Sequence, residues 1–205
     1  MFRLTKPTGR EVERLVVAAS QPSVMNLEHL DVSVGVCDGG LRRGFKRDHL
    51  RTKIGEGRRA FEAGIRAFHA WKQFDLGWVR VANPLAKIEA GQMVAVEVHS
   101  LGLWSVNLSQ IVAKIQTERR FGFIYKTTRT HVEEGEERFE ITLDPESDAS
   151  WYVTEAVSHP RDWLAAVAYP ITRAFQHRFA RDSHRKMRDA VGGEDAIRGG
   201  ESHQT

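Results

Sequence analysis

With 205 residues, 41% hydrophobic side chains and 28% charged ones, the chain has the composition of a soluble globular protein. The length suffices for one substantial core, and no run of about twenty apolar residues predicts a membrane span. A single cysteine, Cys37, excludes an internal disulfide framework. Because the first residues lack the apolar core of a secretory signal, we expect a cytoplasmic protein.

The net charge of +3 is concentrated in a few stretches of basic residues. Such clusters can bind phosphate or nucleic acid. No base-reading motif accompanies them, so nucleic acid is not an expected partner, and a solvated helix face is the simpler interpretation. The clusters lie at Arg42, Arg43, Lys46, Arg47, and from Arg173 through Arg178, Arg181, Arg185 and Lys186 to Arg188.

The N-terminal part is predicted to contain a helix, a strand and a basic loop. A helix over about residues 9–20 follows from helical spacing of Val12, Leu15, Val16 and Ala19, with Thr8 or Thr5 as its cap. Alternation over 32–36 predicts a strand. The basic stretch 41–57 is interrupted by glycines, and we interpret it as a loop.

A second helix is predicted over 56–74, where Phe61, Ile65 and Phe68 recur at helical spacing. Short strands then follow one another with short connections, which is typical of an antiparallel meander. Their predicted ranges are 77–82, 92–99, 108–116, 120–127, 137–143 and 151–157.

The last helix is predicted to begin at Pro160, to bend at Pro170 and to end at Gly192–Gly193. Its apolar stripe is long enough to cover the apolar face of a sheet. We therefore expect one domain over 1–191 and a disordered polar tail over 192–205. The stripe comprises Leu164, Val167, Ala168, Ile171, Phe175 and Phe179.

These elements together favour an α+β fold, in which a curved antiparallel sheet of about seven strands wraps around the long C-terminal helix. Two carboxylates fall on apolar faces of predicted strands. Glu137 lies on the same face of its predicted strand as Phe139, and Glu155 lies on the same face of its predicted strand as Trp151. A carboxylate in such a place is costly unless it is paired, hydrated or protonated, so the pattern predicts a cavity with a few polar anchors. Arg80 or an arginine of the last helix is a candidate partner for Glu137, which makes a buried ion pair the alternative interpretation.

Several segments in this order resemble the DUF1990 family, also called UPF0548. They are FDLGWV at 74–79, GLWS at 102–105, FGFIY at 121–125, HVEEGEERF at 131–139 and QHRF at 176–179. The family is similar to the START-like, Bet v 1-like (SRPBCC) superfamily, so the resemblance implies a helix-grip fold. It also implies binding of lipids, sterols, polyketides or other apolar ligands, and in some members catalysis.

The chain departs from the family pattern before His131. The family has a Tyr-Gly-Thr-Leu-Pro-Gly segment there, whereas this chain has YKTTRT at 125–130, with two cations and without the glycine and proline of a tight turn. The shape and charge of that turn are therefore expected to differ.

His131 and its acidic neighbours allow three interpretations. The imidazole can act as an acid–base group tuned by Glu133, Glu136 or Glu137, because histidine titrates near neutral pH. The same residue types can coordinate a metal, although no second dispersed ligand is evident. The third interpretation is an exposed hairpin connection.

Our leading hypothesis is a protein that binds a small hydrophobic or amphipathic molecule between the sheet and the last helix. Two alternatives remain: an enzyme that uses His131 or Glu137, and an interaction module that uses the basic last helix. No cofactor or metal is expected, and the sequence leaves the oligomeric state open. The candidate ligand-binding residues are Tyr125, Thr127, His131, Glu137, Glu155, Trp104 and Trp151.

Overall fold

Seven antiparallel strands form one curved sheet in the part of the chain that the structure, a computed structural model, describes: residues 3–20, 46–128, 133–160 and 169–201. The strand order is β1-β7-β6-β5-β4-β3-β2, so the sheet is a meander that the first strand joins at its far edge. The strands are β1 (Lys46–Glu56), β2 (Val79–Val81), β3 (Met93–Ser100), β4 (Leu103–Gln116), β5 (Arg120–Thr127), β6 (Glu133–Leu143) and β7 (Ala149–Pro160).

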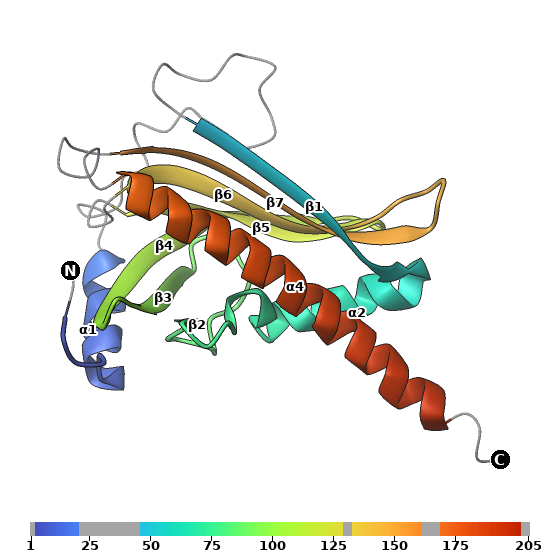
Figure 1. Cartoon of the computed structure of the whole chain (residues 1–205), viewed down its shortest axis with the longest axis horizontal. Helices are drawn as coiled ribbons and strands as arrows, with labels where there is room; N and C mark the ends of the chain where they lie inside the picture. Colours follow the sequence, from blue (N-terminus) through green and yellow to red (C-terminus); the bar gives the residue numbers. More distant parts are fainter. Residues whose placement is uncertain (1–2, 21–45, 129–132, 161–168, 202–205) are drawn as a thin grey trace.

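The long helix α4 (Tyr169–Glu201) lies diagonally across one face of this sheet (Figure 1). We call this face the inner face and the opposite one the outer face. The helix α2 (Gly57–His69) and the short 3-10 helix η1 (Lys72–Phe74) also pack on the inner face. The helix α1 (Gly9–Ala19) covers the outer face of β3 and β4, where Val12 packs with Met93, Ala95 and Leu108. This is the predicted α+β helix-grip architecture.

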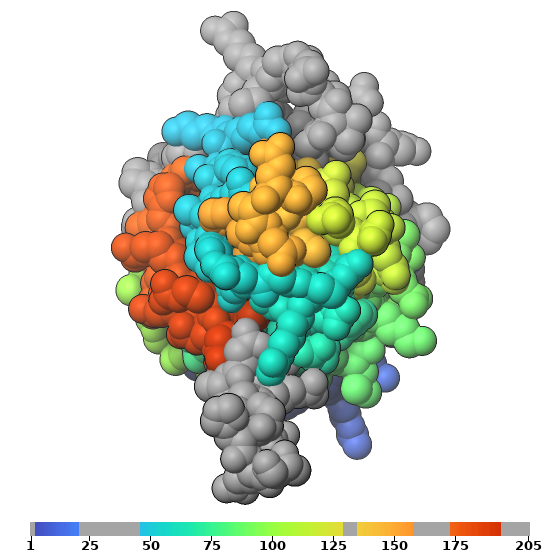
Figure 2. Space-filling model, turned by 90° about the vertical axis from the view of Figure 1, so that its right-hand side faces the viewer, coloured from blue at the N-terminus to red at the C-terminus, as the bar shows by residue number. Residues whose placement is uncertain are grey.

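One end of the inner face is filled by aromatic side chains. The ring of Phe68 in α2 lies 5.9 Å from that of Phe123 and 5.8 Å from that of Tyr152, between centroids. Met187 and Val191 of α4 are fully buried in the same cluster. At this end α2, the β6–β7 turn and α4 adjoin one another on the molecular surface (Figure 2). The aromatic cluster therefore closes this end of the grip.

The first edge strand corrects the prediction of a loop over 41–57. Within that stretch β1 pairs with β7 over its whole length, from Lys46 opposite Ser158 to Glu56 opposite Ala149. The register of the pairing shifts between Lys53 and Gly55. Glycine is needed at position 55, because an added Cβ would lie 2.6 Å from the Cβ of Ala60. Basic residues are tolerated because they lie at the edge of the sheet, where water and carboxylates reach them. The predicted strand at 32–36 lies outside the described residues.

The ends of the last helix also differ from the prediction. Pro160 is the last residue of β7, not part of a first helical turn. Pro170 is the second residue of α4, where the missing N–H has no helical partner to lose. At the other end the helix continues through Gly192 and Gly193 to Glu201. Each glycine costs a helix only about 1 kcal/mol relative to alanine, so the pair alone does not end it.

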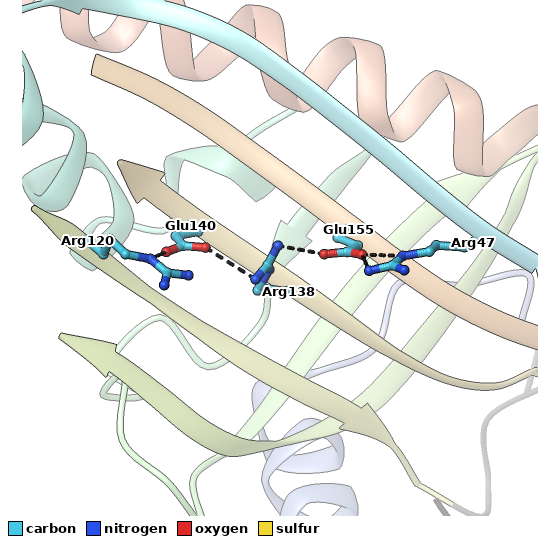
Figure 3. Close-up of polar contacts among 5 residues, drawn as sticks. All are labelled: Arg47, Arg120, Arg138, Glu140 and Glu155. Carbon is cyan, nitrogen blue, oxygen red and sulfur yellow. Dashed lines mark hydrogen bonds and ion pairs between the residues drawn. The ribbon is translucent and has the colours of Figure 1, made fainter. Parts of the chain in front are cut away.

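The outer face carries a chain of ion pairs across β5, β6, β7 and β1 (Figure 3). Arg138 lies at its centre, 2.6 Å from the carboxylate of Glu155 and 3.7 Å from that of Glu140. Arg120 also pairs with Glu140, and Arg47 also pairs with Glu155. Both glutamate side chains are only 2% exposed. Buried carboxylates must be paired, and Glu140 and Glu155 each have two arginine partners.

We expect Arg138→Met to lower the free energy of unfolding by about 2 kcal/mol, because it removes the partner that the two buried carboxylates share. Urea unfolding measures the loss. The control is Arg185→Met, whose side chain is 65% exposed and pairs with Asp182 on the same helix; it should cost less than about 0.5 kcal/mol. Equal losses in the two variants would show that the outer-face chain has no special role.

Candidate functional site

A pocket of about 730 Å³ lies between the inner face of the sheet and α4. Its volume falls in the range of small-molecule sites, and its lining is mostly apolar. The space exists because the inner face changes character along the strands. Where Ile111 and Phe123 fill the closed end, the neighbouring positions toward the pocket are occupied by the smaller Ser105, Asn107 and Ser109 of β4.

Aromatic side chains separate the pocket from the closed end and line the side that faces the sheet. The ring of Phe74 in η1 lies 5.5 Å from that of Phe179 in α4 and 5.3 Å from that of Phe139. Trp78 contacts Phe175 of α4 at 6.1 Å between ring centroids. The indole N–H of Trp78 also donates to Asp182 at 3.0 Å, which fixes the ring against α4. Phe74, Trp78, Phe175 and Phe179 all line the pocket.

Glu137 and Tyr125 form a polar pair on the inner face. They are direct partners across β5 and β6, and the Tyr125 hydroxyl donates to Glu137 Oε2 at 2.8 Å. Burial raises the pKa of Tyr125 well above its usual value, and the charge of Glu137 raises it further. The phenol therefore stays protonated and serves as a donor. Both residues line the pocket, so Glu137 lies on the inner face together with the residues that alternate with it.

A second polar group joins β1 to α4 at the pocket. Asp48 lies on the same row of the sheet as Glu137, since both are opposite Ala156 in β7. Arg173 of α4 donates to Asp48 Oδ1 at 2.7 Å and to Gln176 Oε1 at 2.8 Å. The hydrogen bonds from Arg173 lower the pKa of the Asp48 carboxyl.

Three of the predicted ligand-binding residues do not face the pocket. The carboxylate of Glu155 lies on the outer face between Arg47 and Arg138. Trp151 shares that face and stacks against Arg51, whose guanidinium carbon is 3.9 Å from the ring centroid. Trp104 stacks on His99 with a centroid distance of 4.3 Å, also on the outer face. The prediction assumed that the face of β7 that carries Trp151 and Glu155 was the inner one. In the structure the side chains of Tyr152, Thr154 and Ala156 point inward instead.

The other predicted residues divide into two groups. Thr127 lines the pocket, and its hydroxyl accepts from the backbone N–H of Gly135 at 3.0 Å. His131 lies outside the described residues, as do residues 129 and 130 of the segment 126–130 that departs from the family pattern. The acid–base role of His131 therefore stays a prediction. Glu136 pairs with Lys126 at 3.3 Å, and Arg80, the suggested partner of Glu137, instead pairs with Glu97 at 2.5 Å.

A buried histidine that was not predicted from the sequence holds α4 to the sheet. His184 Nε2 lies 2.9 Å from the Thr154 hydroxyl and Nδ1 lies 2.8 Å from the Thr52 hydroxyl, so one imidazole joins α4 to β7 and β1. Beside it, the hydroxyls of Tyr152 and Ser183 are hydrogen-bonded at 2.8 Å. Burial, with a smaller effect of His49, lowers the pKa of His184 to about 4. The signal available in the sequence was the helical spacing of His184 from Ala180 and Met187, which places the three side chains on one face of the helix.

The described part of the chain contains no cluster of three or more histidine, cysteine or acidic side chains that could hold a metal ion. No described helix is long and apolar enough to cross a membrane. Several basic side chains of α4 pair within the molecule, as Lys186 does with Asp75 at 3.1 Å.

The curved sheet and the long C-terminal helix that packs against it, with the pocket between them, define a helix-grip fold. The match to the model of a domain of unknown function, DUF1990, extends over residues 32–186. The chain belongs to this family. A UPF0548 protein of Dictyostelium discoideum is 32% identical over 165 residues, covering 75% of this chain and 76% of the relative. One from Arabidopsis thaliana is 31% identical over 146 residues, covering 68% and 70%.

Solved structures support the fold. The di-domain ARO/CYC BexL of the BE-7585A biosynthetic pathway superposes with a TM-score of 0.51 at 14% identity, covering 72% of this chain and 50% of that one. A norcoclaurine synthase point mutant from Thalictrum, in complex with a transition-state analogue, gives a TM-score of 0.50 at 7% identity, covering 74% and 96%. At these identities the similarity shows the fold alone.

We expect the stability of the protein to fall on acidification through His184. Its imidazole has a pKa of about 4 in the folded protein, against about 6.5 in an unfolded chain. The unfolded state therefore gains a proton first as the pH drops. This contribution is fully present above pH 6.5 and is lost between pH 6.5 and 4, by about 2 kcal/mol at pH 5.

The measurement is urea unfolding of the wild type and of His184→Asn at pH 7.5 and pH 5. The variant is less stable at pH 7.5, because Thr52 and Thr154 lose their shared partner. It has no imidazole at this position to titrate, so the difference between the two proteins should narrow by about 2 kcal/mol at pH 5. A difference that is the same at both pH values would contradict the assignment.

Proposed function

We propose that this protein binds a small apolar or amphipathic molecule in the pocket between the inner face and α4. The observation that carries the proposal is a space of about 730 Å³, lined mostly by apolar side chains, in which a few polar groups converge. A bound molecule would gain packing contacts with the apolar walls of a space of this size. The Bet v 1-like fold of the family is consistent with this role.

The pocket provides two kinds of contact. Apolar surface comes from Phe74, Phe175 and Phe179 on one side and from Val96 and Val98 on the sheet. Burying apolar area contributes about 25 cal/mol per Å², so this surface supplies most of the affinity. The Tyr125–Glu137 pair then orients the polar end of the molecule.

The test is the binding of N-phenyl-1-naphthylamine, an uncharged probe whose fluorescence rises in apolar surroundings, to the wild type and to Asn107→Phe. Asn107 lines the pocket, so a phenyl ring at this position fills the space that the probe needs. We expect the variant to weaken probe binding at least about tenfold, which corresponds to about 1.4 kcal/mol.

The matched control is Gln110→Phe, which places the same ring on the outer face of the same strand, since Gln110 is opposite Met93 of the outer-face cluster. This control should bind the probe as the wild type does. Probe binding that is absent in the wild type, or that Asn107→Phe leaves unchanged, would reject the pocket as the binding site. Native mass spectrometry of gently purified protein would identify the molecules that it retains.

A further inference from the structure

The hairpin between β3 and β4 carries a leucine where both the turn and the surface disfavour one. Ser100 is directly opposite Leu103, so Leu101 and Gly102 alone form the turn. Both have positive φ, 52° and 75°, which is the conformation of a tight hairpin turn that asparagine, aspartate or glycine normally occupies. The apolar side chain of Leu101 is nevertheless 81% exposed. A residue that suits neither its backbone nor its surroundings points to a role outside the fold.

Leu101 lies at the rim of the pocket. It lines this space together with Ser100 and Leu103, whereas the aromatic cluster fills the closed end. The hairpin lies beside α1, at the end of the molecule away from the β6–β7 turn (Figure 1). A surface that met the tip of this hairpin would therefore meet the rim of the pocket as well.

The N-terminal segment adds a second exposed leucine beside this hairpin. The backbone of Arg3 exchanges two hydrogen bonds with that of Trp104, of 2.8 Å and 2.7 Å. The next residue, Leu4, is 83% exposed. Lys6 Nζ lies 5.6 Å from the ring centroid of Trp104. Leucine, tryptophan and lysine side by side are typical of protein surfaces that lie at the boundary between lipid and water.

The two segments that meet here carry basic side chains and no acidic ones. Residues 3–10 contain Arg3, Lys6 and Arg10, residues 98–117 contain Lys114, and neither range contains an aspartate or a glutamate. Such a surface is complementary in charge to anionic lipid head groups. Two separate leucines offer far less area than the roughly 800 Å² per partner of a stable protein interface, which favours a bilayer over a protein as the partner.

We propose that Leu101, Leu4 and Lys6, together called the docking tip, attach the protein to an anionic lipid bilayer. The two leucines enter the boundary between head groups and acyl chains, and the ammonium group of Lys6 contacts anionic head groups. Docking in this way places the rim of the pocket at the bilayer, so that an apolar molecule passes between the two without crossing water. This transfer rests on the proposed function, whereas the docking itself does not.

The experiment is sedimentation of the protein with vesicles of phosphatidylcholine that contain about 30% phosphatidylserine, at low ionic strength. We expect Leu101→Asn to weaken binding at least about tenfold, because asparagine lacks the apolar surface that leucine buries in lipid. Asparagine tolerates the left-handed conformation, so this variant should melt no lower than the wild type. Lys6→Gln should weaken binding about threefold through the loss of one charge.

The matched controls are Leu85→Asn and Lys87→Gln, which make the same changes in the loop between β2 and β3. Leu85 is 94% exposed, and Lys87 is exposed as well. The loop belongs to the closed end, because the carbonyl of Ala86 accepts a hydrogen bond from the indole of Trp71 in the aromatic cluster. Both control variants should bind the vesicles as the wild type does.

Three binding results would each overturn the proposal: no binding of the wild type, equal binding to vesicles of pure phosphatidylcholine, and equal losses in Leu101→Asn and Leu85→Asn. A Leu101→Asn variant that melts below the wild type would overturn it too, because the leucine would then serve the fold. Vesicle binding by a protein that does not bind N-phenyl-1-naphthylamine would reject the proposed function and leave the docking intact. Probe binding without vesicle binding would do the reverse.

Discussion

The contact between α4 and the inner face of the sheet determines both what the protein buries and what it leaves open. From Asp182 to Val191 the helix is joined to the sheet side by its hydrogen bond to Trp78, by His184 and by Met187 in the core. From Phe175 to Arg181 the same helix faces small and polar side chains that do not fill the space beneath it. A single rigid helix spans both regions, so it cannot descend to close the pocket without losing its contacts in the other. The pocket is therefore a consequence of the way α4 is held.

Carboxylates lie on both faces of the sheet. On the outer face Glu140 and Glu155 are almost fully buried, and each is paired with two arginines. Such carboxylates are structural, because their charge is balanced within the fold. On the inner face Glu137 accepts a hydrogen bond from Tyr125, and both residues line the pocket. The face on which a carboxylate lies, and not its presence on an apolar strand, distinguishes the candidate site from the framework.

Much of the fold could be predicted from the sequence, because period-two alternation and the stripe of the last helix are local signals. The strand β1 could not, since its basic residues find partners in β7 that are more than a hundred residues away, as Arg47 does with Glu155. The site was predicted in part. The alternation of side chains along a strand shows which residues share a face, and it grouped Glu137 with Phe139 correctly. It does not show which face is inner when both are apolar, so Glu155, Trp151 and Trp104 were expected in the pocket although they lie on the outer face.

The most direct measurement of the central claim is a heteronuclear NMR titration of the labelled protein with N-phenyl-1-naphthylamine, followed through the backbone amide signals. The account predicts that the perturbed amides belong to the inner pocket, at Ser105, Asn107, Ser109 and Thr127 in the sheet and from Phe175 to Arg181 in α4. The amides of Trp151 and of α1, which packs on the outer face, should remain unchanged. Perturbations confined to Trp151, α1 and the outer face would contradict the account, and so would a titration that leaves every inner-face amide in place.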